Sequence, residues 1–179
     1  MTILRGVIDR MPTAGARPAK PGVLAVGGGG RSRGSSSADL FGLSNDEEFN
    51  RIAEAVHGIE SRYGTDARMW RLDNLDGPQG PMQVSAAAAV DVGGGDRFDV
   101  YENLLLGRAY LARLLWKYDS WPDALAAYNW GPGNVDQWIA RGRNAAQLPA
   151  ETTRYIALVM RRASLGSIAG TVQQRIPKP

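Results

Sequence analysis

Apolar residues that recur at helical spacing are the feature of this sequence that most constrains its fold. Between Ser44 and Gly64, apolar residues follow one another at spacings of three and four: Phe49, Ile52, Val56, Ile59 and Tyr63. This spacing places all of them on one face of an amphipathic helix. Ser44, followed three residues later by Glu47, has capping-box spacing and predicts the start of this helix, and Gly64 predicts its end.

Helical patterns continue along the rest of the chain. Asp99 with Glu102 repeats the capping-box spacing, and Pro122 and Pro149 suit the first turns of helices. No stretch alternates between apolar and polar residues with the period of two that is typical of a half-buried strand. We therefore predict an all-α domain, with further helices over residues 85–92, 99–118, 122–130, 134–140 and 149–163.

The chain divides into three parts by composition. Residues 1–39 are rich in glycine, proline and serine and predict a flexible segment, residues 40–163 form the domain, and residues 164–179 form a C-terminal tail. The net charge of +3 is unevenly placed, because residues 1–43 carry +4, residues 44–163 carry −3 and the tail carries +2. A nucleic-acid-binding face on the domain is therefore not expected, whereas the basic tails suit contact with an anionic envelope.

Several kinds of chemistry are excluded by residues that the sequence lacks. With no cysteine and one histidine, His57, the chain offers no disulfide, no zinc-thiolate site, no cysteine nucleophile and no histidine-rich metal site. We expect neither a metal nor another cofactor. No run of apolar residues is long enough for a transmembrane segment, and no clear export signal is present, so the export route stays unexplained. A monomer is expected.

Glu60 lies on the border of the first apolar stripe, four residues after Val56 and seven after Ala53. A carboxyl partly withdrawn from water has its charged form disfavoured, which raises its pKa and lets it keep a proton near neutral pH. Such a group can protonate a leaving oxygen as a general acid. The alternative is a solvated helix glutamate paired with an arginine, and periodicity alone favours that alternative.

Four short motifs, taken in order along the chain, favour the interpretation of Glu60 as a general acid. They are Glu60-Ser61, residues 77–83 (GPQGPMQ), Ala126-Ala127-Tyr128-Asn129 with Gly131, and Pro149-Ala150-Glu151-Thr152 with Tyr155. The ordered set resembles the lytic transglycosylase domain of the soluble type, which is related in fold to goose-type lysozyme, and the resemblance covers about residues 48–162. The chain departs from the family pattern at Pro78 and Pro81, where the family usually has alanine and leucine. The segment between Glu60 and Gln83 is also longer than is typical.

The resemblance implies a lysozyme-like multi-helix fold with a cleft, acting on peptidoglycan. Glu60 would protonate the glycosidic oxygen between N-acetylmuramic acid and N-acetylglucosamine. It would then draw the proton from the muramoyl 6-hydroxyl, which attacks its own anomeric carbon and gives a 1,6-anhydro end. An internal nucleophile removes the need for a second carboxylate, as in other exceptions to the two-carboxylate scheme.

The resemblance also assigns substrate-binding residues: Ser61, Met82, Gln83, Tyr128, Asn129, Glu151 and Tyr155. Ser61 would orient Glu60 or the substrate, Met82 would pack on a sugar face, and Tyr155 would approach Glu60. Each also has an ordinary structural alternative: a helix-surface serine for Ser61, core packing for Met82 and Tyr128, and a helix N-terminal carboxylate for Glu151. The tryptophans at 70, 130 and 138 suit sugar stacking and core packing equally.

Two other functions stay open. A goose-type lysozyme would hydrolyse the same bond with water, for which Asp73, Asp76 and Asp96 are conceivable second carboxylates. A non-catalytic wall-binding module could instead dock a cell-envelope secretion or conjugation apparatus through the tails, although such a module would not need Glu60. In each case we expect the protein in the periplasm or cell envelope.

Overall fold

The computed structural model describes residue 43 and residues 45–173, with side chains up to residue 164, and this part of the chain is helical. The prediction of an all-α domain is confirmed for these residues. The expected flexible segment, residues 1–39, lies outside them. In chain order the elements are α2 (Glu47–Ser61), η2 (Ala67–Met69), α3 (Ala86–Asp91), α4 (Val100–Tyr118), α5 (Trp121–Trp130), α6 (Pro132–Ala140), η3 (Ala145–Gln147) and α7 (Ala150–Gln173).

Both ends of α2 differ from the prediction. Asp46 caps the helix by accepting a hydrogen bond from the Phe49 amide at 2.8 Å, so the N-cap is not Ser44, which lies outside the described residues. At the other end the helix stops at Ser61, because Arg62 and Tyr63 already adopt left-handed backbone conformations with φ of 51° and 60°. Tyr63 therefore lies beyond the helix and is not the last member of its buried stripe; its side chain is 44% exposed.

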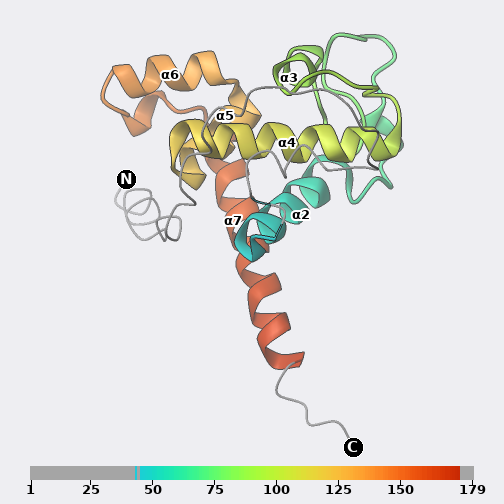
Figure 1. Cartoon of the computed structure of the whole chain (residues 1–179). Helices are drawn as coiled ribbons and strands as arrows, with labels where there is room; N and C mark the ends of the chain where they lie inside the picture. Colours follow the sequence, from blue (N-terminus) through green and yellow to red (C-terminus); the bar gives the residue numbers. More distant parts are fainter. Residues whose placement is uncertain (1–42, 44, 174–179) are drawn as a thin grey trace, which may run out of the picture.

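The end of α7 is a second correction. The apolar pattern predicts an end near Ala163, but the helix continues to Gln173, so the expected tail at residues 164–179 begins as helix. In Figure 1 this last part of α7 extends away from the other helices. The periodicity misses it because that pattern detects an apolar face that packs on a core, and a helix that leaves the body of the protein needs no such face.

The core lies where four helices meet. α2 and α5 both pack against α7, and α4 packs against α5; in Figure 1, α4 runs across the view and α7 descends below it. Apolar side chains from all four helices fill the space between them and are almost completely buried: Phe49, Ile52, Val56, Leu111, Leu114, Leu125 and Val159. This packing fixes the C-terminal turn of α2 against α7, and Glu60 lies in that turn.

Residues 62–85 form a long connection that buried polar side chains hold in place. Asn103, in the first turns of α4, is fully buried: its amide donates to the carbonyls of Gln79 and Arg97 at 2.7 and 2.8 Å, and its Oδ1 accepts from the Met82 amide at 2.9 Å. Gly80 permits this close approach, because with φ of 73° a Cβ at that position would lie 2.4 Å from Nδ2 of Asn103. The connection is therefore anchored on α4, next to α3 (Figure 1).

Candidate active site

Glu60 and Tyr155 are joined by a direct hydrogen bond. Glu60 occupies the last turn of α2, and Tyr155 lies in the second turn of α7, where the two helices pack together. The Tyr155 hydroxyl donates to Oε1 of Glu60 at 2.7 Å. This contact fixes the orientation of the carboxyl and leaves its second oxygen for another partner.

Burial raises the pKa of Glu60 to about 7, against 4.5 for an ordinary glutamate. Loss of hydration is the main cause, since the ionised form loses more from burial than the neutral form. The hydrogen bond from Tyr155 and the positive charge of Arg71 act in the opposite direction and lower the pKa. Near neutral pH, Glu60 is consequently a carboxylic acid in a large share of molecules, and it can donate a proton.

Tyr128, in α5, forms another part of this site. Its hydroxyl donates to the carbonyl of Met82 at 2.8 Å, and its ring lies 5.7 Å from that of Tyr110. The pKa values of Tyr128 and Tyr155 are both raised well above the usual range, first by burial and then by the nearby charge of Glu60. Both tyrosines therefore remain neutral and surround the carboxyl with groups that do not ionise.

Asn129 and Glu151 lie nearer the solvent. Asn129 is exposed, and its Oδ1 accepts a hydrogen bond from Oγ1 of the buried Thr152 at 2.8 Å, which ties the end of α5 to the first turn of α7. Glu151 is exposed in that same first turn. The motifs around Tyr128 and Tyr155 are thus brought together by α5 and α7.

Met82 does not line a surface, so the core-packing alternative holds for its side chain and the expected contact with a sugar face does not. Its side chain is only 1% exposed and belongs to the core. Gly107 in α4 makes this possible, because a Cβ at that position would lie 2.4 Å from Cβ and 2.7 Å from Sδ of Met82. Met82 thus contributes its backbone carbonyl to Tyr128 while its side chain packs against α4, where no sugar can reach it.

Ser61 also differs from expectation. It is 1% exposed, so it is not a helix-surface serine, and its hydroxyl bonds to the backbone instead of to Glu60. Oγ donates to the carbonyl of His57 at 3.3 Å and accepts from the amide of Gly64 at 2.8 Å. These bonds stabilise the turn that ends α2, so Ser61 acts on the neighbouring Glu60 only through the position of the backbone.

The side chain of Gln83 holds the connection together. With φ of 48°, Gln83 adopts a left-handed conformation, and its Nε2 donates to the carbonyls of Met69 and Gly80, both at 2.8 Å. The amide of Gly80 also donates to Met69, at 2.9 Å. The amide nitrogen of Gln83 is therefore already in use, and only its oxygen is left for a substrate.

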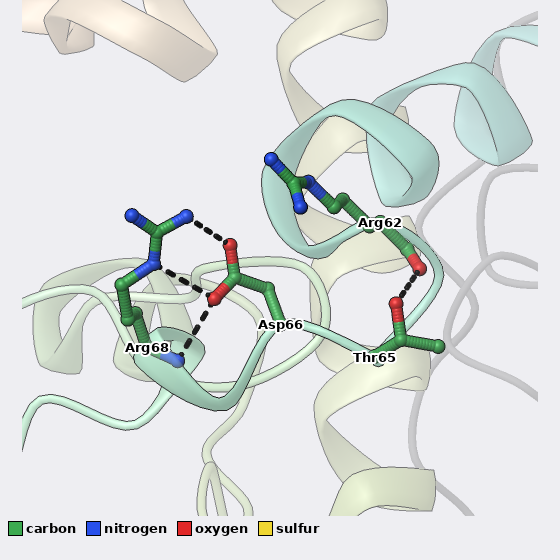
Figure 2. Close-up of polar contacts among 4 residues, drawn as sticks. All are labelled: Arg62, Thr65, Asp66 and Arg68. Carbon is green, nitrogen blue, oxygen red and sulfur yellow. Dashed lines mark hydrogen bonds and ion pairs between the residues drawn. The ribbon is translucent and has the colours of Figure 1, made fainter.

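An ion pair fixes the turn that leads from α2 into this connection. Figure 2 shows the Arg68 guanidinium facing the Asp66 carboxylate, with the two hydrogen bonds at 2.7 and 2.9 Å. These bonds hold the pKa of Asp66 far below its usual range. Next to it, the Thr65 hydroxyl donates to the carbonyl of Arg62 at 2.7 Å (Figure 2). The ion pair stabilises the loop, and it leaves the Arg68 guanidinium engaged with Asp66.

The remaining candidates have ordinary environments. Trp138 is 7% exposed and its Nε1 donates to the carbonyl of Asn144 at 2.8 Å, which makes it a core residue. Trp70 is half-buried and stacks on Phe98 at 6.4 Å, and Trp130 packs partly buried against the core. His57 meets the ring of Tyr63 edge-on at 5.4 Å. None of these contacts involves Glu60.

Three residues that matter here were missed at the level of sequence: Arg71, Gln79 and Asn103. Gln79 lies inside the motif at residues 77–83 but was given no role there, and no periodicity or pair spacing marks Arg71 or Asn103. Within the described residues, no three histidine, cysteine, aspartate or glutamate side chains are grouped as metal ligands, and no helix is long and apolar enough to cross a membrane.

Comparison with known proteins agrees with this arrangement. The family described as "Transglycosylase SLT domain" matches residues 47–149, which include Glu60, Gln83 and Tyr128. Together with the helical architecture, this match confirms the expected lysozyme-like fold class. The "Membrane-bound lytic murein transglycosylase F" of Desulfosudis oleivorans is 41% identical over 66 residues, which are 33% of this chain and 14% of that protein. No solved structure shows significant similarity to the chain.

Proposed function

The chain belongs to the transglycosylase SLT domain family, and we propose that it cleaves peptidoglycan strands without water, leaving 1,6-anhydromuramoyl ends. The observation that carries this proposal is the half-buried Glu60, held by Tyr155 and with a pKa of about 7. The relative named above is described as a murein transglycosylase, but the similar region is a small part of its length.

In the first step, Glu60 acts as the general acid. It donates its proton to the glycosidic oxygen that joins N-acetylmuramic acid to N-acetylglucosamine, and that bond breaks as positive charge develops at the anomeric carbon. Tyr155 holds the carboxyl in one orientation through the 2.7 Å hydrogen bond, and stabilises the carboxylate that the proton transfer leaves behind. General acid catalysis of this kind contributes about 10²–10⁴-fold to a rate.

In the second step, the ionised Glu60 acts as the base. It takes the proton of the muramoyl 6-hydroxyl, whose oxygen forms a bond to the anomeric carbon, and Glu60 returns to its acid form. Within the part of the chain that the structure describes, Glu60 interacts with Tyr155, Tyr128 and Arg71, none of which is a carboxylate. This arrangement suits an internal nucleophile better than the two-carboxylate hydrolysis scheme.

The aspartates that a hydrolase could use as a second carboxylate lie in exposed loops. Asp73, Asp76 and Asp96 are all exposed in loops, and Oδ1 of Asp96 accepts a hydrogen bond from the Phe98 amide at 2.8 Å. Asp96 therefore shapes the turn before α4. Hydrolysis by a goose-type lysozyme mechanism is the alternative outcome, and its product has one more water.

Peptidoglycan as substrate also sets the location that we propose, which is the periplasm or cell envelope. A wall-cutting domain of this size suits a cell-envelope secretion or conjugation apparatus that must pass through the wall. The charge of the chain agrees with a domain that is not a nucleic-acid binder, since residues 44–163 carry a net charge of −3 and the net positive charge lies outside them.

The direct test is turnover of purified peptidoglycan by Glu60→Gln. This variant keeps the size of the side chain and loses the proton, so soluble products should form at least about 10²-fold more slowly. Glu54→Gln is the matched control, because it removes an exposed carboxylate from the same helix. Unchanged turnover in Glu60→Gln would refute the assignment of the acid.

A further inference from the structure

Arg71 lies in the connection after η2, next to the proposed acid. We propose that the Arg71 guanidinium is a specificity-determining group that binds a substrate carboxylate, carried by the muramoyl lactyl group or by the peptide stem attached to it. This inference rests on the proposed function, because it takes peptidoglycan as the substrate. It adds recognition of the anionic part of the strand to the cleavage of its sugar backbone.

The backbone of Arg71 is unusually well fixed for a solvent-facing residue. The side chain of Gln79, which is fully buried, accepts from the Arg71 amide and donates to the Arg71 carbonyl, both at 2.8 Å. The same Nε2 also donates to the carbonyl of Asn74 at 2.8 Å. A buried amide with both ends satisfied by one neighbouring segment holds that segment in a single position. Arg71 therefore projects from a rigid base.

The guanidinium of Arg71 is free, whereas those of Arg68 and Arg97 are in use. Arg68 forms the ion pair with Asp66. Arg97 donates to the carbonyls of Gly77, Leu75 and Val84. Within the described part of the chain, the side chain of Arg71 forms no hydrogen bond or ion pair, although the residue is exposed. Its charge is available for a ligand.

A chain of contacts connects the segment that carries Arg71 to the residues around Glu60. The carbonyl of Met69, two residues before Arg71, accepts from the side chain of Gln83 and from the amide of Gly80. The neighbouring carbonyl of Met82 accepts a hydrogen bond from Tyr128, and the charge of Glu60 raises the pKa of that tyrosine. Arg71 itself acts on Glu60 through its positive charge. Because Glu60 is neutral while it serves as the acid, it does not neutralise Arg71.

The substrate carries carboxylates that could bind the Arg71 guanidinium. Muramoyl residues carry a lactyl group, which in intact strands is joined to a peptide stem with free carboxylates. A planar guanidinium binds a carboxylate through two parallel hydrogen bonds, which gives direction as well as attraction. A strand bound with its scissile bond at Glu60 brings a muramoyl substituent close to that carboxyl, and Arg71 is an unpaired cation whose charge acts on Glu60.

The test is a comparison of kinetic constants for Arg71→Gln, Arg71→Lys and Arg141→Gln. Arg141 is an exposed arginine at the C-terminal end of α6, which lies on the far side of α5 from the connection (Figure 1), so its substitution controls for the loss of one charge. On strands with native stems, Arg71→Gln should raise KM about 5-fold and leave kcat nearly unchanged, since an exposed ion pair contributes up to about 1 kcal/mol. The KM of Arg71→Lys should lie between those of the unmodified protein and Arg71→Gln.

Three substrates identify the anion. Strands with native stems carry the stem carboxylates, chemically amidated strands keep the stem without its charge, and amidase-stripped strands expose the lactyl carboxylate instead. Assays at about pH 5.5 keep Glu60 protonated in every variant, while the substrate carboxylates remain largely ionised. The Arg71→Gln effect should vanish on amidated strands. Its persistence on stripped strands would identify the lactyl group as a ligand, and its loss there would identify the stem.

The inference and the proposed function fail in different ways. If the unmodified protein releases no product from any strand, the proposed function is wrong. If it cleaves, but Arg71→Gln raises KM equally on native and amidated strands, or leaves KM unchanged on native strands, Arg71 does not bind a carboxylate. Unchanged circular dichroism and melting temperature are expected, because the substitution leaves the backbone bonds to Gln79 in place.

Discussion

The raised pKa of Glu60 predicts that this residue destabilises the folded protein at alkaline pH. A pKa of about 7 in the folded state, against 4.5 for an ordinary glutamate, means that folding favours the protonated form. The contribution of Glu60 to stability is therefore most favourable below about pH 4.5, and it is lost as the pH rises from there through 7. Once Glu60 is fully ionised, the loss amounts to about 3 kcal/mol, at about 1.4 kcal/mol for each tenfold change in the equilibrium.

Glu60→Gln removes this pH dependence, because the amide resembles the protonated carboxyl and its oxygen can still accept the hydrogen bond from Tyr155. The variant should unfold at nearly the same urea concentration as the unmodified protein at about pH 4. At about pH 8 it should be more stable by about 3 kcal/mol, which is a large part of the stability of a small domain.

The assay is urea unfolding at a series of pH values, followed by circular dichroism, with Glu151→Gln as the control. Glu151 is an exposed carboxylate in the first turn of α7, so its removal shows the effect of net charge without that of burial. If the stability difference between Glu60→Gln and the unmodified protein were constant from pH 4 to pH 8, the carboxyl would not be desolvated. The account of Glu60 as an acid at neutral pH would then lose its physical basis.

Tyr155→Phe removes a hydrogen bond that lowers the pKa of Glu60, so the alkaline fall in activity, centred near pH 7, should move to higher pH; a shift to lower pH in the rate profile would contradict this. Met82→Ala should lower the free energy of unfolding by about 2–5 kcal/mol, measured by urea titration, because the side chain is buried against Gly107; a surface residue would show almost no change. Turnover should survive EDTA, and recovery on adding a divalent ion would reveal a metal site.

The helical part of the fold could be predicted because the core pattern is local. Phe49, Ile52 and Val56 recur at helical spacing, and the structure buries all of them almost completely. The exact ends were less predictable: Asp46 and Ser44 are both good capping residues, and the choice depends on which side chain reaches the Phe49 amide. The extension of α7 to Gln173 could not be predicted, because apolar periodicity detects only a helix face that packs on a core.

The site could be predicted only in part, because a motif gives positions but not the direction in which a side chain points. The resemblance implied that Tyr155 approaches Glu60, and in the structure the Tyr155 hydroxyl lies 2.7 Å from Oε1 of Glu60. Met82 and Ser61 belong to the same motifs, yet both side chains are buried, one against α4 and the other against the backbone of its own turn. The position of Arg71 is fixed by hydrogen bonds between its backbone and the side chain of Gln79, eight residues later in the same loop. A loop has no periodic pattern, so the sequence does not predict these bonds.

The most direct test of the central claim is the mass of the muropeptides released from purified peptidoglycan. If the muramoyl 6-hydroxyl attacks its own anomeric carbon, the products carry 1,6-anhydro ends and are one water lighter than hydrolysis products. Digestion in heavy-oxygen water should also introduce no label at the new ends. We predict anhydro products from the unmodified protein and none from Glu60→Gln. Reducing ends that carry the heavy oxygen would show that water is the nucleophile, and would contradict the account.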